Sequence, residues 1–476
     1  MARGGVKQSA AGAPVEGPWT LPEGWHWERL ETVGRWGSGG TPNIKTPRYY
    51  GGDIPWFRSG ELRDRPLADP EIKITEEGLQ GSSAKLIAPG AVLVAMYGAT
   101  VGKLAISTRV CATNQAIAFC IPDLETITAR YLFFYLLSIR RHLRDQAQGG
   151  AQPNISQSLL KEQIIPVPPV ARQALIVARI DELFAEVDNG EAALARARDD
   201  LATWRKALLK AAVTGELTAD WRATNLPNKT GADLLAHVLA DRRERWKARP
   251  ASTGKRYVEP ASADQTGLPM LPDGWAWSSM GQLLDRIEAG LNVKCVERPP
   301  VGDETGLLKI SAVTWWRFNE RASKTLADSH VHPDQWLIAD GDLLLSRANT
   351  LELVGAPAIV ENLSLRLMLS DKVLRLAMPA YLRRWTFYVL RSPYGRAWIE
   401  SHSTGNQLSM RNISQDALRA MPIPLPPRIE LDRIVEILDA AAVQHETTVS
   451  DVGIFDAAAA TLRQSILAAA FCGDLA

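Results

Sequence analysis

Two short patterns in this chain of 476 residues could carry chemistry, but neither has the spacing that the chemistry needs. Residues 98–103 read Gly-Ala-Thr-Val-Gly-Lys and look at first like a phosphate-binding loop. That loop needs four residues between its glycines, and this segment has three. His330 and His332 could begin a metal site, but no Cys or acidic residue stands at ligand spacing from them. We therefore predict that neither segment binds ATP or a metal, and that the histidines lie on a surface turn.

Further signatures of catalysis or secretion are also missing from the sequence. There is no Asn/Asp-Pro-Pro-aromatic tetrad, with which an amino-methyltransferase holds its target base, and no nucleophile elbow or His-Glu-x-x-His pattern. The cysteines, at positions 111, 120, 295 and 472, form no C-x-x-C pair, which favours reduced thiols in a cytoplasmic protein. No run of 18 apolar residues predicts a membrane span.

Side chains that can hydrogen-bond to DNA bases or phosphates gather in two parts of the chain. In the first part they are Asn43, Lys45, Arg48, Arg58, Arg63, Tyr97, Lys103, Asn114 and Gln115. In the second part they are Lys309, Arg317, Ser346, Arg347, Asn349 and Lys372. The net charge of +1 does not by itself indicate a nucleic-acid binder, although an acidic face can balance a basic one. Any one of these residues also fits a solvated surface position.

The sequence contains an internal repeat. The sequence Leu-Pro-Glu-Gly-Trp at 21–25 returns as Leu-Pro-Asp-Gly-Trp at 271–275, and Asn-Ile-Ser-Gln at 154–157 returns at 412–415. The separation of 258 residues between the two Asn-Ile-Ser-Gln motifs then holds without a gap to the end of the chain. The segments between these anchors share only a coarse pattern. Each half therefore consists of a variable block followed by a tail of constant length.

The two blocks read as mixed α/β. Strand-like runs at 91–96 and 116–119, followed by a predicted helix at 128–146, are repeated as runs at 343–345 and 373–376 and a helix at 380–400. The predicted boundaries are 1–18 for a disordered N-terminus, 19–165 and 271–425 for the blocks, 166–217 and 426–476 for helical tails, and 218–270 for a charged helix with a linker.

Each tail has apolar residues that alternate in steps of four and three, the spacing of a coiled-coil seam. We expect the first helix to contribute Ile176, Ile180, Leu183, Gly190, Leu194, Trp204 and Leu208. The second is expected to contribute Ile434, Leu438, Ala441, Phe455, Leu462 and Ile466.

Full antiparallel overlap of the tails places large residues opposite small ones. Gly190 then faces Phe455, and Trp204 faces Ala441. Leu at position 190 is therefore expected to overpack the pair. The alternative is that each helix packs on its own block.

The segment between the halves is strongly basic. Residues 229–256 hold eight Lys or Arg and three Asp or Glu, mostly in a predicted helix at 231–248. A solvated face is the favoured interpretation of this helix, and a contact with DNA phosphates is the alternative.

The doubled chain resembles the specificity (S) subunits of type I restriction-modification systems, the HsdS family. The resemblance rests on both Leu-Pro-x-Gly-Trp openings and both Asn-Ile-Ser…Pro-x-Pro-Pro junctions. It also rests on segments 52–58, 96–103, 113–115, 307–313 and 346–350. It covers residues 19–476 and implies two α/β target-recognition domains in a pseudo-twofold repeat, joined by two long helices that form an antiparallel coiled coil.

The resemblance also implies a function. Each domain would read one half of a split site in double-stranded DNA, and the helices would set the gap and dock two modification (methyltransferase) subunits, which restriction subunits join. S-adenosylmethionine, ATP and Mg²⁺ would be bound by those partners, which would methylate or cleave the DNA, and this chain would be non-catalytic.

Two other classes of protein remain possible from the residues alone. One is a fusion with a methyltransferase in the same chain, against which the missing tetrad argues. The other is a coiled-coil adaptor with two ligand-binding domains that does not bind DNA.

Overall fold

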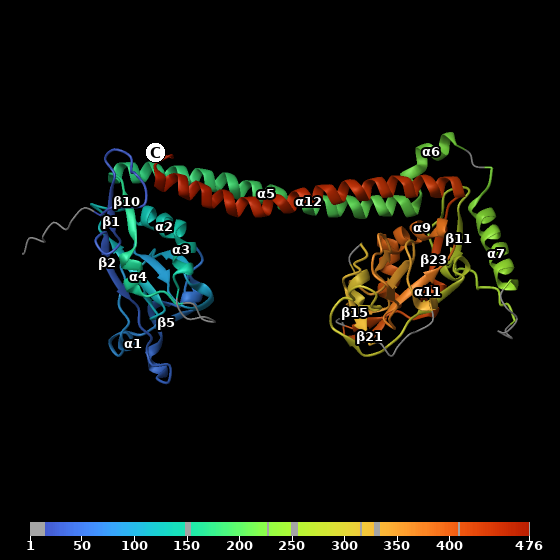
Figure 1. The fold of residues 1–476 in the computed structure, drawn as a ribbon, viewed down its shortest axis with the longest axis horizontal. Coiled ribbons are helices and arrows are strands. Elements are labelled where there is room, and N and C mark those ends of the chain that lie inside the picture. The colour runs from blue at the N-terminus through green and yellow to red at the C-terminus, as the bar shows by residue number, and fades with distance from the viewer. Residues whose placement is uncertain are drawn as a thin grey trace, which may run out of the picture. The chain divides into compact units, whose positions relative to one another are not determined.

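The structure is a computed structural model that describes residues 15–147, 154–225, 228–248, 256–314, 317–327, 334–407 and 410–475. The chain forms two compact units, each of mixed helices and strands as predicted (Figure 1). Unit 1 combines Met1–Ala195 with Asp451–Ala476, and unit 2 is Arg196–Ser450. Each unit therefore contains one block and parts of both helical tails.

Unit 1 is built on a five-stranded sheet and a three-stranded sheet. The larger sheet has the order β2 (Gly34–Ser38), β9 (Ile117–Pro122), β6 (Val92–Ala95), β7 (Leu104–Ile106) and β4 (Arg65–Pro66). The smaller sheet has the order β5 (Ile72–Ile74), β3 (Tyr50–Phe57) and β8 (Ala112–Thr113). Short helices α1 (Glu76–Gln80) and α4 (Gln157–Glu162) complete the block.

Unit 2 has a related plan, but its sheets differ in number and in the number of strands. Its first sheet has the order β12 (Arg286–Ala289), β20 (Val373–Ala377), β16 (Leu343–Ser346) and β18 (Pro357–Ile359). The other sheets are β13 (Cys295–Val296), β15 (Ser323–Leu326), β14 (Gly306–Leu308) and β19 (Leu367–Met368), and then β17 (Ala348–Asn349), β22 (Met410–Asn412) and β21 (Thr404–Gln407). Its short helices are α8 (Met280–Leu283) and α11 (Gln415–Ala420).

Each block is closed by the two sequence repeats that bound it. The strand after the first Leu-Pro-x-Gly-Trp, β1 (His26–Arg29), pairs antiparallel with β10 (Ile164–Val167). The strand after the second, β11 (Ala276–Ser279), pairs with β23 (Pro422–Leu425) in the same relative register. The repeated motifs at the two ends of a block thus meet in space, which explains why they bracket segments that differ.

Each predicted block helix is divided in two. Residues 128–146 form α2 (Ala129–Ser138) and α3 (Arg140–Asp145), and residues 380–400 lie in α9 (Ala380–Arg391) and α10 (Pro393–His402). In the second case Pro393 has no backbone N–H and its ring clashes with the preceding turn, which ends α9. Ser392 then accepts a hydrogen bond from the Gly395 N–H and caps α10.

The tails form two helices of 45 residues, α5 (Val170–Thr214) and α12 (Arg428–Cys472). In unit 1, Arg463 of α12 pairs with Asp188 of α5 at 2.5 Å and with Glu191 at 2.8 Å. In unit 2, Trp204 and Ala441 line one small cavity between the helices. The helices therefore run antiparallel within each unit (Figure 1).

The helices also pack on the block of their unit. They therefore both pair with each other and pack on a block, which combines the two alternatives for the tails. Ile176 and Ile180 of α5 share a buried apolar cluster with Ile466 of α12 and with residues of α2. The ring of Phe471 lies 5.2 Å from that of Tyr131, edge to face. In unit 2, Ile434 and Leu438 are buried in a cluster that includes α9.

The middle of the expected seam is not packed as we predicted. Phe455 is 57% exposed, Leu462 is 51% exposed and Trp204 is 46% exposed. Gly190 is exposed, and a Cβ atom added there would meet no atom within 4 Å. The contact of Gly190 with Phe455 is therefore a wrong prediction. Leu183, Leu194, Leu208 and Ala441 are half-buried. Among the described residues of the expected seam, those that are fully buried also pack against a block.

Gly190→Leu should consequently stabilise the protein by about 1 kcal/mol, because Gly is a poor helix former and the new side chain meets open space. This is the opposite of the overpacking that the register alone predicted. The measurement is the free energy of unfolding in urea. Ala185→Leu, also exposed on α5, is the matched control and should change little. A loss of stability in Gly190→Leu alone would show that position 190 is packed.

The C-terminal ends of both long helices reach the Leu-Pro-x-Gly-Trp motif of the unit in which they end. Gly215 follows α5 at φ +76°, and Gly473 follows α12 at φ +93°. A Cβ atom at Gly215 would lie 2.5 Å from Pro272, and one at Gly473 would lie 2.3 Å from Pro22. Both the left-handed backbone and the close contact require glycine here.

Unit 2 has a buried carboxylate at the same place. Glu430, which is 0% exposed, accepts hydrogen bonds from Thr218 (2.7 Å), from Arg222 of α6 (Ala219–Thr224; 2.5 Å) and from the Trp275 indole (3.0 Å). One buried side chain thus joins α12, the segment after α5 and the opening motif of the block.

Residues 15–18, expected to belong to a disordered start, are partly ordered, because Val15 pairs with Trp27. Residues 1–14 of that start lie outside the described residues, as do His330 and His332.

Candidate nucleic-acid interface

Three segments meet at one edge of block 1, and their equivalents meet at the same edge of block 2. The Ile155 N–H donates to the Met96 carbonyl (3.0 Å), and the Met96 N–H donates to the Ala116 carbonyl (2.8 Å). In block 2 the Ile413 N–H donates to the Arg347 carbonyl (3.1 Å), and the Arg347 N–H donates to the Lys372 carbonyl (2.9 Å). We call the meeting point the recognition edge: residues 96–103, 113–116 and 154–156 in block 1, and 346–355, 369–372 and 412–414 in block 2.

A fourth segment reaches the recognition edge from strand β2 or β12. The Gly40 N–H donates to the Thr113 carbonyl (2.8 Å), and the Leu291 N–H donates to the Leu369 carbonyl (3.1 Å). In block 1 a Cβ atom added to Gly39 would lie 2.2 Å from the Thr113 carbonyl oxygen. In block 2 a Cβ atom added to Gly290 would lie 1.7 Å from the Leu369 carbonyl oxygen. Gly39 and Gly290 are therefore equivalent, and only glycine allows this approach.

The edge of block 1 gathers four of the predicted residues. Tyr97 is 41% exposed, and Gln115 is exposed and accepts a hydrogen bond from Thr41. Asn114 is half-buried, and its Oδ1 atom has no hydrogen-bond partner among the described residues. Lys103 is held by Asp64, at 2.8 Å. The exposed members, Tyr97 and Gln115, are thus available to a ligand as they stand.

The turn at 98–103 is braced from behind by arginines. Arg140 Nε donates to the Gly102 carbonyl (2.7 Å), and Arg144 Nε donates to the Val101 carbonyl (3.0 Å). Arg140 also pairs with Asp64. Burial alone would raise the pKa of Asp64, but hydrogen bonds from Lys103 and Arg140 outweigh it and hold this pKa below its ordinary value. Asp64 therefore stays ionised, and Lys103 positions the turn.

The other predicted residues of block 1 lie before and after strand β3. Arg48 pairs with Glu77 at 3.0 Å, and Arg58 pairs with Glu71 and Glu61. Asn43, Lys45 and Arg63 are exposed. The side chains of Lys45 and Arg63 have no ion-pair partner among the described residues.

Block 2 also brings four predicted residues to its edge. Ser346 is a correction, because its side chain is fully buried and cannot touch DNA as it stands. Arg347 is half-buried, and its Nε atom has no hydrogen-bond partner in the described part of the chain. Asn349 accepts a hydrogen bond from the Thr350 N–H (2.9 Å), and Lys372 pairs with Asp371 (2.9 Å) and is half-exposed.

The remaining two residues of block 2 are engaged within unit 2. Lys309 pairs with Glu297 at 3.1 Å. Arg317 pairs with Glu446 of α12. The sequence could not show these partners, because both are distant in the chain.

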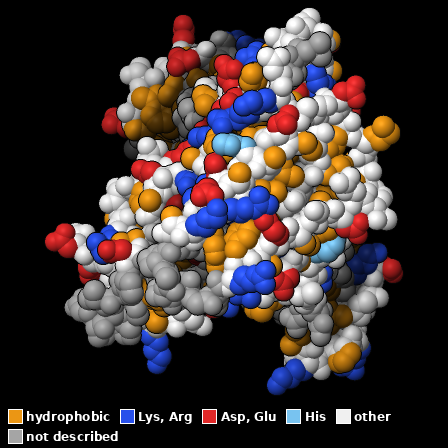
Figure 2. Space-filling view, turned by 90° about the vertical axis from the view of Figure 1, so that its right-hand side faces the viewer, with side chains coloured by type: hydrophobic (Ala, Val, Ile, Leu, Met, Phe, Trp, Pro, Cys, Tyr) orange, Lys and Arg blue, Asp and Glu red, His pale blue; other side chains and the backbone are white. Residues whose placement is uncertain are grey.

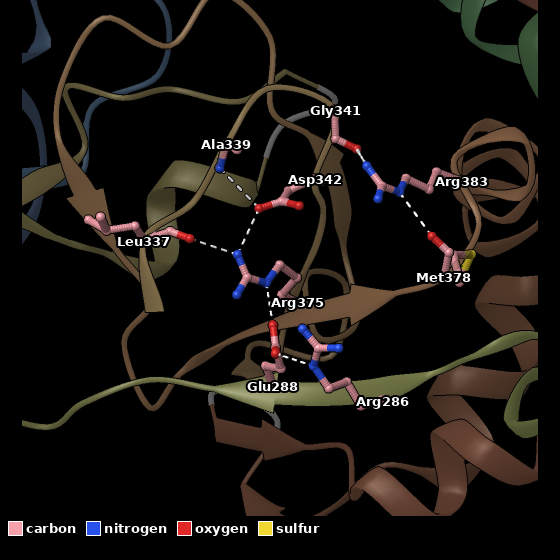
Figure 3. Close-up of polar contacts among 9 residues, drawn as sticks. All are labelled: Arg286, Glu288, Leu337, Ala339, Gly341, Asp342, Arg375, Met378 and Arg383. Atoms are coloured by element: carbon pink, nitrogen blue, oxygen red, sulfur yellow. Dashed lines mark hydrogen bonds and ion pairs between the residues drawn. The ribbon is translucent and has the colours of Figure 1, made fainter. Parts of the chain in front are cut away.

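A buried ion network in block 2 was not foreseen. Arg375 donates to Asp342 (3.0 Å) and to the Leu337 carbonyl (2.7 Å), and it pairs with Glu288 (Figure 3). The three charged side chains are between 12% and 16% exposed. Burial would lower the pKa of Arg375, but hydrogen bonds to Asp342 and Glu288 raise it above the ordinary value.

Block 1 fills the same place with apolar atoms. Glu288 pairs with Arg375 across β12 and β20, and the equivalent pair across β2 and β9 is Gly37 with Phe119. Phe119 belongs to a buried apolar cluster. The blocks thus share one backbone frame but have different cores, which explains why their sequences match only coarsely.

The charged helix α7 (Gly231–Lys247) is mostly neutralised. Arg245 pairs with Asp285 (2.9 Å), Lys247 pairs with Glu244 (2.7 Å) and Arg243 pairs with Glu259. Figure 2 shows blue and red side chains interspersed on the face of the molecule that includes this helix. These pairs favour the solvated face over the phosphate contact.

The described residues hold no cluster of metal ligands and no membrane-spanning helix. No group of three or more His, Cys, Asp or Glu side chains there could hold a metal ion. No helix in that part of the chain is long and apolar enough to cross a membrane.

Comparison with solved structures defines the fold. The chain is similar to a structure from work on complex assembly and conformational transition of a type I restriction-modification system, with a TM-score of 0.66, 19% identity and coverage of 95% and 99% of the two chains. It is also similar to the HsdS subunit of Thermoanaerobacter tengcongensis, with a TM-score of 0.56, 20% identity and coverage of 96% and 99%. The predicted α/β fold with two long helices is confirmed.

Comparison of sequences shows which proteins the chain is similar to. The family model of the type I restriction modification DNA specificity domain matches residues 22–195. The EcoEI specificity subunit of Escherichia coli is 32% identical over 270 residues, which cover 55% of this chain and 43% of that subunit. The EcoKI specificity subunit of Escherichia coli K12 is 24% identical over 96% of this chain and 90% of its own length. Residues 22–195 thus match the type I restriction modification DNA specificity domain, and nearly the whole chain is similar to type I specificity subunits.

The extent of these matches differs. Alignment with the EcoEI subunit and with the MjaIX subunit of Methanocaldococcus jannaschii spans less than half the length of either relative. The EcoKI match spans both halves of the chain.

Proposed function

We propose that each block reads one half of a two-part site in double-stranded DNA. The observation that carries this proposal is the recognition edge, which occurs in both blocks on the same backbone hydrogen bonds with different side chains. A common frame with exchangeable side chains is what two readers of different short sequences need, because base edges are distinguished by hydrogen-bonding groups. Tyr97 and Gln115 in block 1, and Arg347, Asn349 and Lys372 in block 2, are the proposed readers.

The paired helices α5 and α12 would set the distance between the half-sites and dock two modification subunits, which restriction subunits then join. The chain would do no chemistry itself. S-adenosylmethionine, ATP and Mg²⁺ would be held by the partners, which methylate adenine at N6 or cleave unmethylated DNA. Such a complex would work in the cytoplasm of a prokaryotic cell.

A gel-shift experiment separates this function from that of an adaptor that does not bind DNA. The chain is purified with its modification subunits, and the target site is taken from the methylome of a host that expresses them. We expect a shift with the site that survives competition by unrelated DNA. An equal shift with both DNAs, or none, would favour the adaptor.

The spacer role predicts the effect of one extra heptad inserted in α5 near Leu201. Seven residues preserve the phase of the seam and add about 10 Å of helix at 1.5 Å per residue. This equals about three base pairs at 3.4 Å each. We expect methylome sequencing to show unchanged half-sites with a longer gap, or no methylation if the blocks meet the wrong face of DNA. An active variant with the original gap would contradict a spacer role for the helices.

A further inference from the structure

A short sequence is repeated just beyond the glycine that enters each recognition edge. In block 1, Gly39 is followed by Asn-Ile-Lys at 43–45, and in block 2, Gly290 is followed by Asn-Val-Lys at 292–294. The two glycines are equivalent by their contacts with the facing carbonyl oxygens. The interval from glycine to asparagine is two residues shorter in block 2, and this difference hides the repeat in a fixed-offset comparison.

Both triplets lie outside regular strands and present polar side chains to solvent. Asn43, Lys45, Asn292 and Lys294 are all exposed. Asn43 Oδ1 accepts a hydrogen bond from the Lys45 N–H (3.0 Å), which folds the first triplet into a compact turn. Ile44 at the tip of that turn is 81% exposed, which is unusual for a residue of this type.

The two lysines differ from most other cations near the edges. Lys103, Lys309 and Lys372 each pair with a carboxylate. The ammonium groups of Lys45 and Lys294 have no ion-pair partner among the described residues. Each block therefore presents an unpaired, exposed lysine a few residues beyond the glycine that enters its recognition edge. If the two blocks read different half-sites, the phosphate backbone is the feature of DNA that both would meet.

We propose that the Asn-Ile-Lys turn of block 1 and the Asn-Val-Lys segment of block 2 are phosphate-binding elements, one in each block, which position the DNA for the neighbouring recognition edge. This rests on the proposed DNA-reading function. Lys45 and Lys294 each contact a backbone phosphate as a compact positive charge, and the asparagine side chain beside each lysine offers a further hydrogen-bond donor. The elements contribute affinity in both halves but do not select the bases.

The test measures DNA binding by the chain in complex with its modification subunits over a range of salt concentrations. The variants are Lys45→Ala, Lys294→Ala and both together. Each substitution should lower the magnitude of the slope of log Kobs against log salt by about 0.9, since one phosphate contact is lost. The loss of affinity should be similar for target and unrelated DNA, and methylome sequencing should show an unchanged site.

Two controls keep the result specific. Lys45→Arg retains the charge and should retain the wild-type slope. Lys210→Ala removes an exposed lysine of α5 and should leave the slope unchanged. If the wild-type complex binds its site and both lysine variants keep the wild-type slope, the phosphate-binding element is wrong while the DNA-reading function stands. A changed base preference in either half would make these turns readers instead. If the wild-type complex binds no specific site, both proposals fall.

Discussion

Arg375→Met should destabilise unit 2 by about 3–5 kcal/mol, because it leaves Asp342 without the Arg375 cation in a largely buried site. Glu288 then keeps only Arg286, whose side chain is 54% exposed. The measurement is the unfolding transition in urea. Arg366→Met is the matched control, because its ion pair with Asp334 is exposed, so the transition should move little. An unchanged transition in Arg375→Met would show that the network does not hold block 2 together.

The equivalent residues of block 1 provide a second arm to this experiment. Asp342 directly precedes β16, as the buried Ala91 directly precedes β6 in block 1. Replacing the network with the apolar set, as Glu288→Gly, Asp342→Ala and Arg375→Phe together, should recover a large part of the lost stability. A buried ion network can often be exchanged for packed apolar side chains at little net cost, whereas removing one member cannot. A triple variant that is less stable than Arg375→Met would contradict the equivalence of the two cores.

Glu430→Ala should cost a similar amount, about 3–5 kcal/mol, since it strands the Arg222 guanidinium, which is only 17% exposed. It also leaves the Thr218 hydroxyl and the Trp275 indole N–H without their acceptor. The melting temperature should fall for the transition that includes unit 2. Glu436→Ala removes a carboxylate that is 69% exposed on the same helix and should change the melting temperature little. Equal melting temperatures for the two variants would show that the buried carboxylate does not stabilise the unit.

The architecture could be predicted from the sequence because the two halves of the chain repeat it. Heptad spacing predicted both long helices, and the runs at 91–96 and 343–345 predicted β6 and β16. The burial of the seam was not predictable from one helix pair. Ile176 and Ile434 are buried because a block covers them, whereas Phe455 has the same spacing and lies exposed.

The candidate site was predictable in its location but not in its details. Residues at 97, 114 and 115 were selected by type, and the structure brings them to one edge through backbone hydrogen bonds that no local pattern encodes. Asp64, which holds Lys103, is 39 residues away in the chain. The equivalence of Gly39 and Gly290 was hidden because insertions shift the offset between the halves.

Replacing residues 28–150 with the matching block of a type I specificity subunit, followed by methylome sequencing of a host that also expresses the modification subunits, tests the central claim most directly. Because the described residues of each recognition edge come from one block and its junction, we expect one half of the methylated site to change and the other half to stay the same. A site whose two halves both change, or a site that does not change at all, would contradict it.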